Sequence, residues 1–304
     1  MEVVIVVAEF KHQLKVKGYA FNTIEIYRKN LDQFMTWLTG QTITDIRAVT
    51  RQVILDYQAH VMAQPVAMET KALKIRAVKR LFEYLEDSHQ LLVNPTEGIV
   101  ETCRKNFKIG PVLSEAEMQK LLEQPNLSWP GQIRDRAIME VFYSTAIRLD
   151  ELRSLEVYHV DIKSRVIYIR KGKGNRQRVV PLGKQAAHFL TEYLNRIRPI
   201  YARKNPKTRN LFLCQNGRPI TRGAIRARLK EYRESAGITK PVSPHVFRRS
   251  CATHLLQGGA DIRYVQKLLG HKEIKTTQQY TKIKPVEIKQ IHNKTHPNHK
   301  GEHP

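Results

Sequence analysis

The chain has 304 residues, of which 41% are apolar, and this is enough for two compact domains with cores of their own. No run of residues approaches the roughly 18 consecutive apolar residues that a membrane-spanning helix needs, which argues against a membrane protein. The formal charge is +24, and it is distributed unevenly. Residues 1–100 hold 12 basic and 11 acidic side chains, whereas residues 101–304 hold 40 and 17. An excess this one-sided predicts a polyanionic partner, with the phosphate backbone of nucleic acid as the leading candidate.

The cysteines and the N-terminal segment bear on the compartment. Cys103, Cys214 and Cys251 lie far apart in the sequence, which is typical of neither a disulfide framework nor a zinc site. We therefore expect reduced thiols in a cytoplasmic protein, which would be associated with the nucleoid if its polyanionic partner is DNA. The apolar run VVIVV follows the acidic Glu2 and lacks a preceding basic region, so it does not resemble a signal peptide.

Residues 1–100 are predicted to form a first, helical domain, with helices running over residues 8–100. A helix from Thr23 to Leu38 places apolar side chains at helical spacing, and Gly40 follows it as a stop signal. Its apolar stripe consists of Ile24, Tyr27, Leu31, Phe34 and Leu38. A second helix from Glu69 to Glu86 has the stripe Leu73, Ala77, Leu81 and Leu85. Its basic side chains are Lys71, Lys74, Arg76, Lys79 and Arg80, which suit either an ordinary amphipathic helix or one that contacts DNA.

A polar and basic linker is predicted over residues 101–111, followed by a second domain over 112–290 and a tail over 291–304 that carries His and Lys. Ser114 and Glu117 are spaced as a capping box at the start of a helix. Helical patterns follow over 134–144, 185–198 and 222–235, and residues 166–182 have the pattern of a β-hairpin around a glycine-containing turn. The expected fold is mainly α with a small antiparallel sheet.

The segment SPHVFRRSCATHLLQGG, residues 243–259, has the features of a helix that binds an anion at its N-terminus. Ser243 is a suitable N-cap, Pro244 suits the first helical position, and two glycines end the segment. His245 and Arg248 then share one face of the first turn, where unpaired N–H groups and the helix dipole already favour an anion. A His-x-x-Arg pair alone is weak evidence, because it occurs by chance in many chains.

Three further segments gain meaning only in combination. In ADIRYVQKLLGH, Asp261 caps a helix, Gly270 ends it and His271 comes just past the end, with Tyr280 nine residues later. In STAIRLDEL, Arg148 precedes Glu151 by three residues, which suits a weak surface ion pair or an arginine held toward a phosphate. In KGKGN, Lys173 stands between two glycines at the hairpin tip. Each of these residues has an ordinary explanation when it is considered alone.

Together the residues meet the requirements of phosphoryl transfer from DNA to a tyrosine. A phenol with a pKa near 10 needs a base or a cationic environment to lose its proton. The transition state carries more negative charge than the ground state, and it needs fixed cations and hydrogen-bond donors. The departing 5′-oxygen needs a proton donor, which a lysine can supply. The set that meets these needs is Arg148, Lys173, His245, Arg248, His271 and Tyr280.

These motifs resemble, in the same order, those of the tyrosine recombinase (phage integrase) family, and the whole chain is similar to its Xer-type members. TAIRLDEL resembles the first arginine box, HVFRRSCATHLL the His-x-x-Arg box, and LLGHKEIKTTQQYT the motif with histidine and tyrosine. IRKGKGNRQRVVPLG resembles the hairpin that carries the family's lysine. Ala146-Ile147 departs from the Gly-Leu that commonly precedes the first arginine, which suggests a packing change. Arg249 stands where a histidine is common, and it is expected to add a phosphate contact.

The resemblance implies a role for each matching residue. Tyr280 would attack the scissile phosphate and form a 3′-phosphotyrosyl bond, while Arg148 and Arg248 would bind the non-bridging oxygens. His245 and His271 would donate to those oxygens or move the tyrosine proton, and Lys173 would protonate the leaving 5′-oxygen, with Lys171 as the alternative acid. Glu151 would have a supporting, positioning role. Further contacts to DNA are expected from Lys71, Lys74, Arg76, Lys79, Arg80, Lys171, Arg176 and Arg249.

The resemblance also implies a shape and partners. A helical, SAM-like core-binding domain and an α+β catalytic domain would form a C-shaped clamp on duplex DNA with paired inverted-repeat sites. Four copies would assemble in the synapse, with the segment after Tyr280 docking on a neighbouring protomer through Ile283, Val286, Ile288 and Ile291. The expected function is site-specific recombination for a mobile element or replicon resolution, without metal, ATP or another cofactor. The alternatives are relaxation of DNA by a type IB topoisomerase mechanism and an inactive architectural DNA-binding protein.

Overall fold

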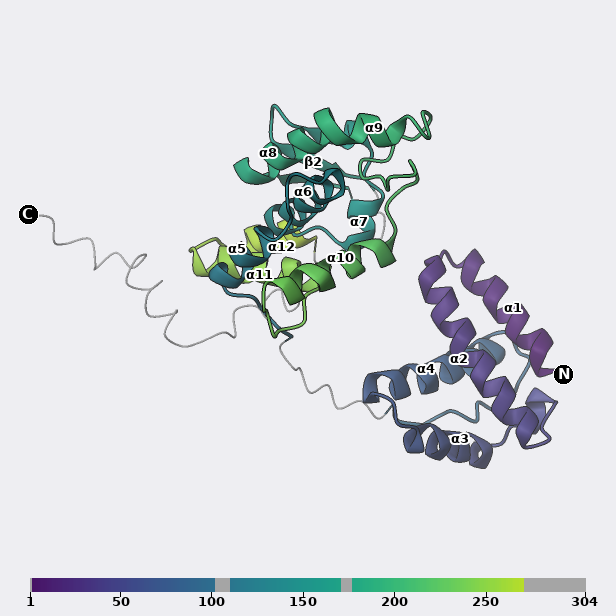
Figure 1. Ribbon diagram of the computed structural model, residues 1–304. Coiled ribbons are helices and arrows are strands. Elements are labelled where there is room, and N and C mark those ends of the chain that lie inside the picture. The colour runs from purple at the N-terminus through teal and green to yellow at the C-terminus, as the bar shows by residue number, and fades with distance from the viewer. Residues whose placement is uncertain (1, 102–109, 171–176, 271–304) are drawn as a thin grey trace, which may run out of the picture. The chain divides into compact units, whose positions relative to one another are not determined.

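The computed structural model describes residues 2–101, 110–170 and 177–270, and the chain divides into two compact units, Met1–Phe107 and Lys108–Pro304 (Figure 1). The described part is mainly helical with one small sheet, as the sequence predicts. No helix within the described ranges combines the length and the apolar content that a bilayer crossing needs. The predicted linker stays a prediction, because residues 102–109 lie outside the described residues.

The first unit is a bundle of helices around one apolar core. Its elements are α1 (Val3–Val16), α2 (Phe21–Gly40), the 3-10 turn η1 (Ile46–Ala48), α3 (Arg51–Ala63) and α4 (Met68–Asp87). The predicted stripe of α2 is confirmed, with Ile24, Leu31, Phe34 and Leu38 buried. The helical region begins earlier than predicted, because VVIVV opens α1 and buries Val3, Val6 and Val7.

The predicted stripe of α4 is wrong at its first position. Leu73 is exposed, whereas the neighbouring Lys74 is 7% exposed and donates from Nζ to Oε1 of Gln64. The predicted spacing of four residues turns by about 40° more than a full helical turn at each step, so Leu73 lies about 120° from Leu85 around the helix axis. Lys74 therefore fills a buried position, and its ammonium group is hydrogen-bonded there.

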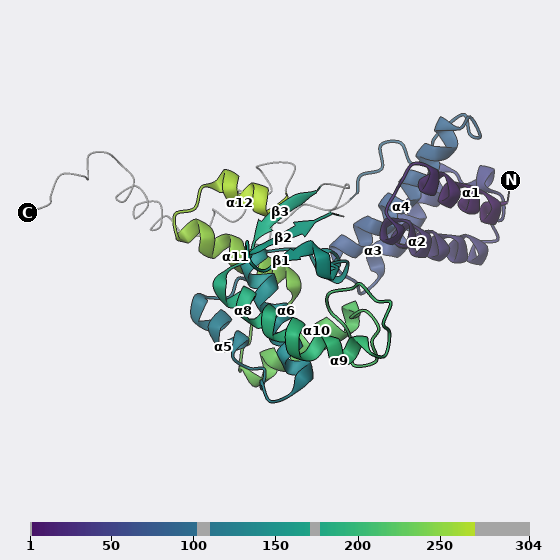
Figure 2. The same ribbon diagram turned by 90° about the horizontal axis from the view of Figure 1, so that it is seen from above.

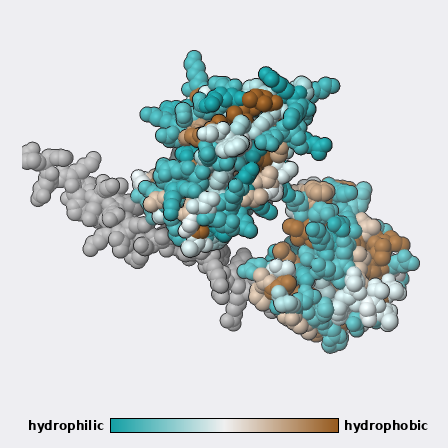
Figure 3. Space-filling model, in the orientation of Figure 1, coloured by the Kyte–Doolittle hydropathy of each residue, from teal (hydrophilic) through white to brown (hydrophobic). Residues whose placement is uncertain are grey.

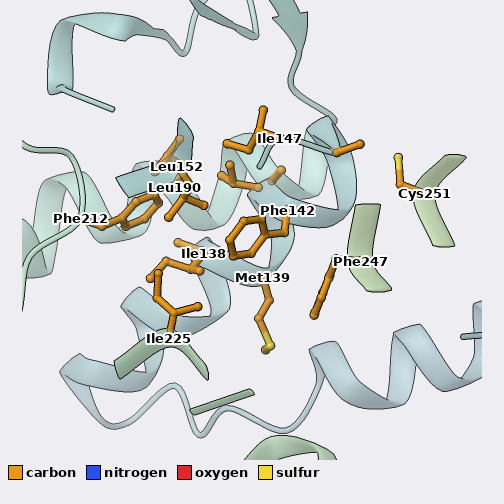
Figure 4. Packing of buried hydrophobic residues seen from close by; sticks show 14 of the residues in the cluster. Ile138, Met139, Phe142, Ile147, Leu152, Leu190, Phe212, Ile225, Phe247 and Cys251 are labelled. Atoms are coloured by element: carbon orange, nitrogen blue, oxygen red, sulfur yellow. The ribbon is translucent and has the colours of Figure 1, made fainter. Parts of the chain in front are cut away.

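The second unit is built around the long helix α6 (Pro130–Thr145), against which α5 (Glu115–Leu122), α8 (Lys184–Glu192) and α11 (Pro244–Gln257) pack. Its remaining helices and turns are α7 (Leu149–Arg153), η2 (Val157–His159), the π-helical η3 (Tyr193–Ile197), α9 (Arg198–Ala202), α10 (Arg222–Ser235) and α12 (Ile262–Leu269). Ser114 and Glu117 form the predicted capping box of α5. In Figure 4, Met139 and Phe142 of α6 lie between Phe247 on one side and Leu190 on the other.

The sheet is small and antiparallel, in the order β1 (Val160–Asp161), β2 (Val166–Ile169) and β3 (Arg178–Pro181). The predicted hairpin is confirmed, with Ile167 opposite Val180 and Ile169 opposite Arg178. The sequence did not predict β1, because two residues carry no recognisable alternation. Figure 2 shows β2 and β3 beside α11 and α12, and β3 packs against α12. Figure 3 shows a mostly hydrophilic surface with separate apolar patches on both units.

Candidate active site

The first arginine box lies in a sharp turn between α6 and α7. Ala146 ends α6 in the left-handed region, with φ 50° and ψ 25°, and Ile147 is fully buried. Arg148 then takes the N-cap position of α7, where its backbone N–H donates to Glu151 Oε2 at 2.8 Å. Glycine is favoured in the left-handed region because it has no Cβ. The predicted packing change at Ala146 is therefore first of all a backbone constraint.

Glu151 is buried, so its contact with Arg148 is not the weak surface ion pair that was one reading of the sequence. Its side chain is 3% exposed and accepts from Arg148 Nη1 at 2.9 Å. Arg178 donates to the same carboxylate from Nη1 at 3.0 Å and from Nη2 at 2.7 Å. Burial alone would raise the pKa of Glu151, but hydrogen bonds from Arg178 and the Arg148 N–H, with both positive charges, lower it to about 2. Glu151 is therefore ionised at neutral pH and fixes two guanidinium groups.

Arg178 is a site residue that our sequence analysis missed. It begins β3 on the inward face of the hairpin, the same face as the buried Val180 and Ile167. A charged residue at an inward position of a strand needs a partner, and this was the available signal. Its Nε also donates to the carbonyl of Leu268 at 3.0 Å, near the end of α12.

The His-x-x-Arg box opens α11 as predicted. Ser243 accepts from the backbone N–H of Val246 and Pro244 occupies the first turn. Arg248 is 5% exposed; its Nη1 donates to the carbonyl of Ala146 at 2.6 Å and its Nη2 to that of Leu269 at 2.5 Å. The second arginine is therefore hydrogen-bonded to the backbone two residues before the first.

His245 is exposed beside this cluster. Partial desolvation lowers its pKa below the ordinary value of 6.5, and so do the positive charges of Arg248, Arg249, Arg148 and Arg226. The imidazole is therefore neutral at pH 7 in the absence of an anion. Arg226, on the exposed face of α10, is a second residue that the motifs did not single out; the basic pattern of 222–233 was the available signal.

The opposite face of α11 holds the backbone where the second unit begins. Ser250 accepts from the N–H of Leu113 at 2.9 Å, and His254 Nε2 lies 2.9 Å from the Leu113 carbonyl. His254 Nδ1 is 2.8 Å from the hydroxyl of Tyr143. Arg249, predicted to contact phosphate, has a long contact of 3.5 Å from Nη1 to the Pro111 carbonyl.

Five predicted residues lie outside the described residues: Lys171, Lys173, Arg176, His271 and Tyr280. Among the residues that are described, no group of three or more His, Cys, Asp or Glu side chains is arranged to hold a metal ion.

The basic residues of α4 all have acceptors within the first unit. Lys71 donates to the Met62 carbonyl, Lys79 to the Ile99 carbonyl, Arg76 to Glu101 and Arg80 to Glu83. Lys74 is buried, which removes it from the predicted contacts to DNA. The other four stay predictions.

Comparison with protein families gives two matches along the chain. Residues 111–286 match the phage integrase family, and residues 7–89 match the phage integrase N-terminal SAM-like domain. The chain belongs to the phage integrase family. It is therefore a tyrosine recombinase, a site-specific recombinase that cuts and rejoins DNA.

Similar recombinases cover nearly the whole chain. The tyrosine recombinase XerD of Staphylococcus haemolyticus is 35% identical over 281 residues, which is 92% of this chain and 94% of that protein. The XerA recombinase structure is 26% identical with a TM-score of 0.54, covering 96% of this chain and 98% of that one. The structure of the XerH recombinase bound to palindromic difH has a TM-score of 0.74 at 20% identity. The match covers 93% of this chain and 84% of that one. At that identity the likeness is one of fold.

Proposed function

We propose that this tyrosine recombinase cleaves a DNA strand by attack of the Tyr280 phenolate oxygen on the scissile phosphate. The observation that carries the proposal is the convergence of Arg148, Arg248 and His245. Arg248 donates to the Ala146 carbonyl at 2.6 Å, two residues before Arg148, and the charges of both arginines lower the pKa of His245. Such a cluster suits a group that carries more negative charge in the transition state than in the ground state.

The step balances without a cofactor. A bond forms between the Tyr280 oxygen and phosphorus, and the bond from phosphorus to the 5′-oxygen breaks, which leaves a 3′-phosphotyrosyl linkage. We assign the proton for the leaving oxygen to Lys173, and the phenol proton to His245 or His271 as acceptor. Arg148 and Arg248 would bind the non-bridging oxygens, and Glu151 would hold Arg148 in place. Rejoining is the reverse reaction with a new 5′-hydroxyl, so no external energy source is required.

The direct test is a suicide DNA substrate, which traps the covalent complex after cleavage. Tyr280→Phe is expected to abolish the adduct while DNA affinity stays unchanged, because it removes one hydroxyl. An adduct in that variant would refute the assignment of the nucleophile. The wild type is expected to form the adduct in the presence of a chelator, and a strict requirement for magnesium would refute the metal-independent step.

The proton donor is tested with a DNA whose leaving group is a 5′-sulfur, since a thiolate leaves without a proton. Lys173→Ala is expected to cleave this DNA at nearly the wild-type rate and ordinary DNA slowly. If the sulfur gives no rescue for Lys173→Ala but does so for Lys171→Ala, then Lys171 is the acid.

We further propose duplex DNA with paired inverted repeats as the substrate, with contacts to both units. The net charge of +24 supports a large contribution from phosphate contacts, so affinity should fall steeply with salt. The proposed contacts are Lys71, Arg76, Lys79, Arg80, Lys171, Arg176 and Arg249. Replacing any one of them should weaken binding to all sequences alike and reduce the salt dependence.

A cavity of about 950 Å³ in the second unit supports the proposed docking of the segment after Tyr280 from a neighbouring copy. Apolar surface from Leu122, Phe189 and Leu255 lines it, and these come from α5, α8 and α11. The segment after Tyr280 offers the apolar side chains Ile283, Val286, Ile288 and Ile291. In light scattering on paired sites, wild-type protein should form a tetramer. The Leu255→Glu variant should occupy single DNA sites without assembling further. A tetramer in that variant would refute this cavity as the docking site.

A further inference from the structure

Arg178 makes hydrogen bonds to two segments that are far apart in the sequence. Two nitrogens donate to the Glu151 carboxylate at 3.0 and 2.7 Å, and Nε donates to the Leu268 carbonyl at 3.0 Å. The side chain is 12% exposed. A planar guanidinium can direct several donors at fixed angles, whereas an ammonium group acts as a compact charge on a flexible stem. The contacts of Arg178 therefore fix a geometry as well as neutralising a charge.

On one side, Arg178 acts through Glu151 on Arg148. Glu151 receives both the backbone N–H of Arg148, at 2.8 Å, and its Nη1, at 2.9 Å. The orientation of the Arg148 guanidinium thus depends on a carboxylate that Arg178 holds by both of its oxygens.

On the other side, Arg178 and Arg248 hold adjacent carbonyls at the end of α12. Arg178 binds the carbonyl of Leu268, and Arg248 binds that of Leu269 at 2.5 Å. Gly270 follows in the left-handed region with φ 63°, and a Cβ there would lie 3.4 Å from Arg178 Cδ, Nε and Nη1. The end of α12 is therefore packed onto Arg178, and it links Arg178 to the arginine of α11.

A charge-balancing role does not account for this arrangement. One arginine would neutralise Glu151, and Arg148 is already hydrogen-bonded to it. A lysine at position 178 could supply a second positive charge, but it could not serve both carboxylate oxygens and the Leu268 carbonyl in the same geometry. Any second positive charge could neutralise the Glu151 carboxylate. The guanidinium of Arg178 also fixes the positions of its hydrogen-bond acceptors.

We propose that Arg178 is a positioning residue for strand cleavage, which sets Arg148 through Glu151 and Arg248 through the end of α12. The proposal rests on the proposed function, in which these two arginines bind the scissile phosphate. A displacement of about 1 Å in a catalytic group can cost about 100-fold in rate. The role therefore predicts a large change in the cleavage step and a small one in DNA affinity.

The experiment compares Arg178→Gln and Arg178→Lys with Arg170→Gln in the full chain. Arg170 lies on the same hairpin, and it lines the same cavity of about 320 Å³ as Glu151. It is the matched control for the loss of one positive charge. At saturating suicide DNA, Arg178→Gln should cleave about 10- to 100-fold more slowly than Arg170→Gln, with affinities that agree within about threefold. Arg178→Lys should also be slow, and equal rates in Arg178→Gln and Arg170→Gln would overturn the proposal.

A second readout does not depend on activity. NMR titration of the Glu151 carboxyl carbon should show a raised pKa in Arg178→Gln, and an unchanged one would overturn the link from Arg178 to Glu151. The charged and titratable groups near Glu151 are Arg148, the N-cap of α7, and Arg178 of β3, with Glu156, His159 and Arg170 along the shared cavity. The last three are the same in the wild type and in Arg178→Gln, so the difference between these two proteins reports on Arg178.

A double variant separates positioning from stability. Arg178→Gln leaves Glu151 buried with one arginine, so it should lower the melting temperature. Arg178→Gln with Glu151→Gln removes both charges, so folding should recover while cleavage stays slow. Recovery of cleavage to the wild-type rate would reduce Arg178 to a neutralising role and overturn the proposal. If the wild type and Arg170→Gln also form no adduct, the proposed chemistry itself fails, which is distinct from a failure of Arg178 alone.

Discussion

Two buried glutamates in the second unit have pKa values that are shifted in opposite directions. Glu140 on α6 is 5% exposed and forms an ion pair with Arg136 at 2.8 Å, yet burial raises its pKa above the ordinary value. Glu151 is equally buried, but its pKa is lowered to about 2. Glu140 has a hydrogen bond from one arginine, whereas Glu151 receives bonds from two arginines and from a backbone N–H.

The surroundings of Glu140 and of Glu151 also differ in their balance of positive and negative charge. On α6 two buried arginines are matched by two buried carboxylates, with Arg134 on Asp135 and Arg136 on Glu140, and the exposed Arg228 of α10 also lies 3.5 Å from Asp135. Around Glu151 two guanidinium groups share one carboxylate, and Arg248 lies close by on the Ala146 carbonyl. A surplus of fixed positive charge costs self-repulsion unless an anion arrives. The surplus at Glu151 is therefore what a phosphate-binding site requires, and the balance on α6 is what a structural pair requires.

The same substitution in both regions should test this contrast most strongly. Arg148→Lys keeps the charge but loses the planar fork, and we expect cleavage of suicide DNA to slow by about 100- to 1,000-fold. Arg134→Lys makes the same change in the balanced region and should leave cleavage at saturating DNA within about threefold. Its effect should be a loss of stability of about 1–3 kcal/mol, seen in urea unfolding. Equal rates for the two variants would remove the functional contrast.

Glu151→Gln should be the most destabilising change at a single acid. It leaves two partly buried guanidinium groups without their shared counter-charge, and we expect a loss of about 3 kcal/mol at pH 7. The folded pKa of Glu151, about 2, lies below its ordinary value of 4.5, so its contribution is fully present above pH 4.5. The contribution is lost as the pH falls toward 2. Unfolding free energies of wild type and variant, measured from pH 7 to pH 3, should therefore converge, and a constant gap would contradict the assignment.

Glu140→Gln should have a smaller effect, of the opposite sign. Because burial raises the pKa of Glu140, its ionised form is disfavoured in the folded state, and this cost appears as the pH rises through its folded pKa. A neutral amide avoids that cost while it still accepts from Arg136. We expect no change or a gain of about 1 kcal/mol at pH 7, measured by urea unfolding. A loss as large as that of Glu151→Gln would show that the two glutamates do not differ.

Most of the fold could be predicted, because caps and periodic stripes act locally. Ser114 and Ser243 cap the predicted helices, and the hairpin pairs as its alternation indicates. The motif pattern also selected Arg148, His245 and Arg248, which the structure brings together. What was missed depends on tertiary contacts: Arg178 gains its meaning from Glu151 and Leu268, which are 27 and 90 residues away. The exposure of Leu73, by contrast, follows from helical geometry, because each step of four residues drifts by about 40° around the axis.

Ala146→Gly offers the smallest expected effect, at the residue whose carbonyl accepts a hydrogen bond from Arg248. The residue has φ 50° and is fully buried. Ala146→Gly relieves about 1–2 kcal/mol of left-handed strain, but it removes a buried methyl group worth about 0.8 kcal/mol and adds backbone entropy to the unfolded chain, about 0.4–1 kcal/mol. These terms nearly cancel, so stability should change by less than about 1 kcal/mol.

Ala146→Val is the comparison variant, because a β-branched residue tolerates the left-handed conformation poorly. It should lower stability by about 2 kcal/mol or more, and it should slow cleavage by moving the carbonyl of residue 146. If valine at 146 were as stable and as active as alanine, the left-handed turn would not be what holds Arg248 beside Arg148.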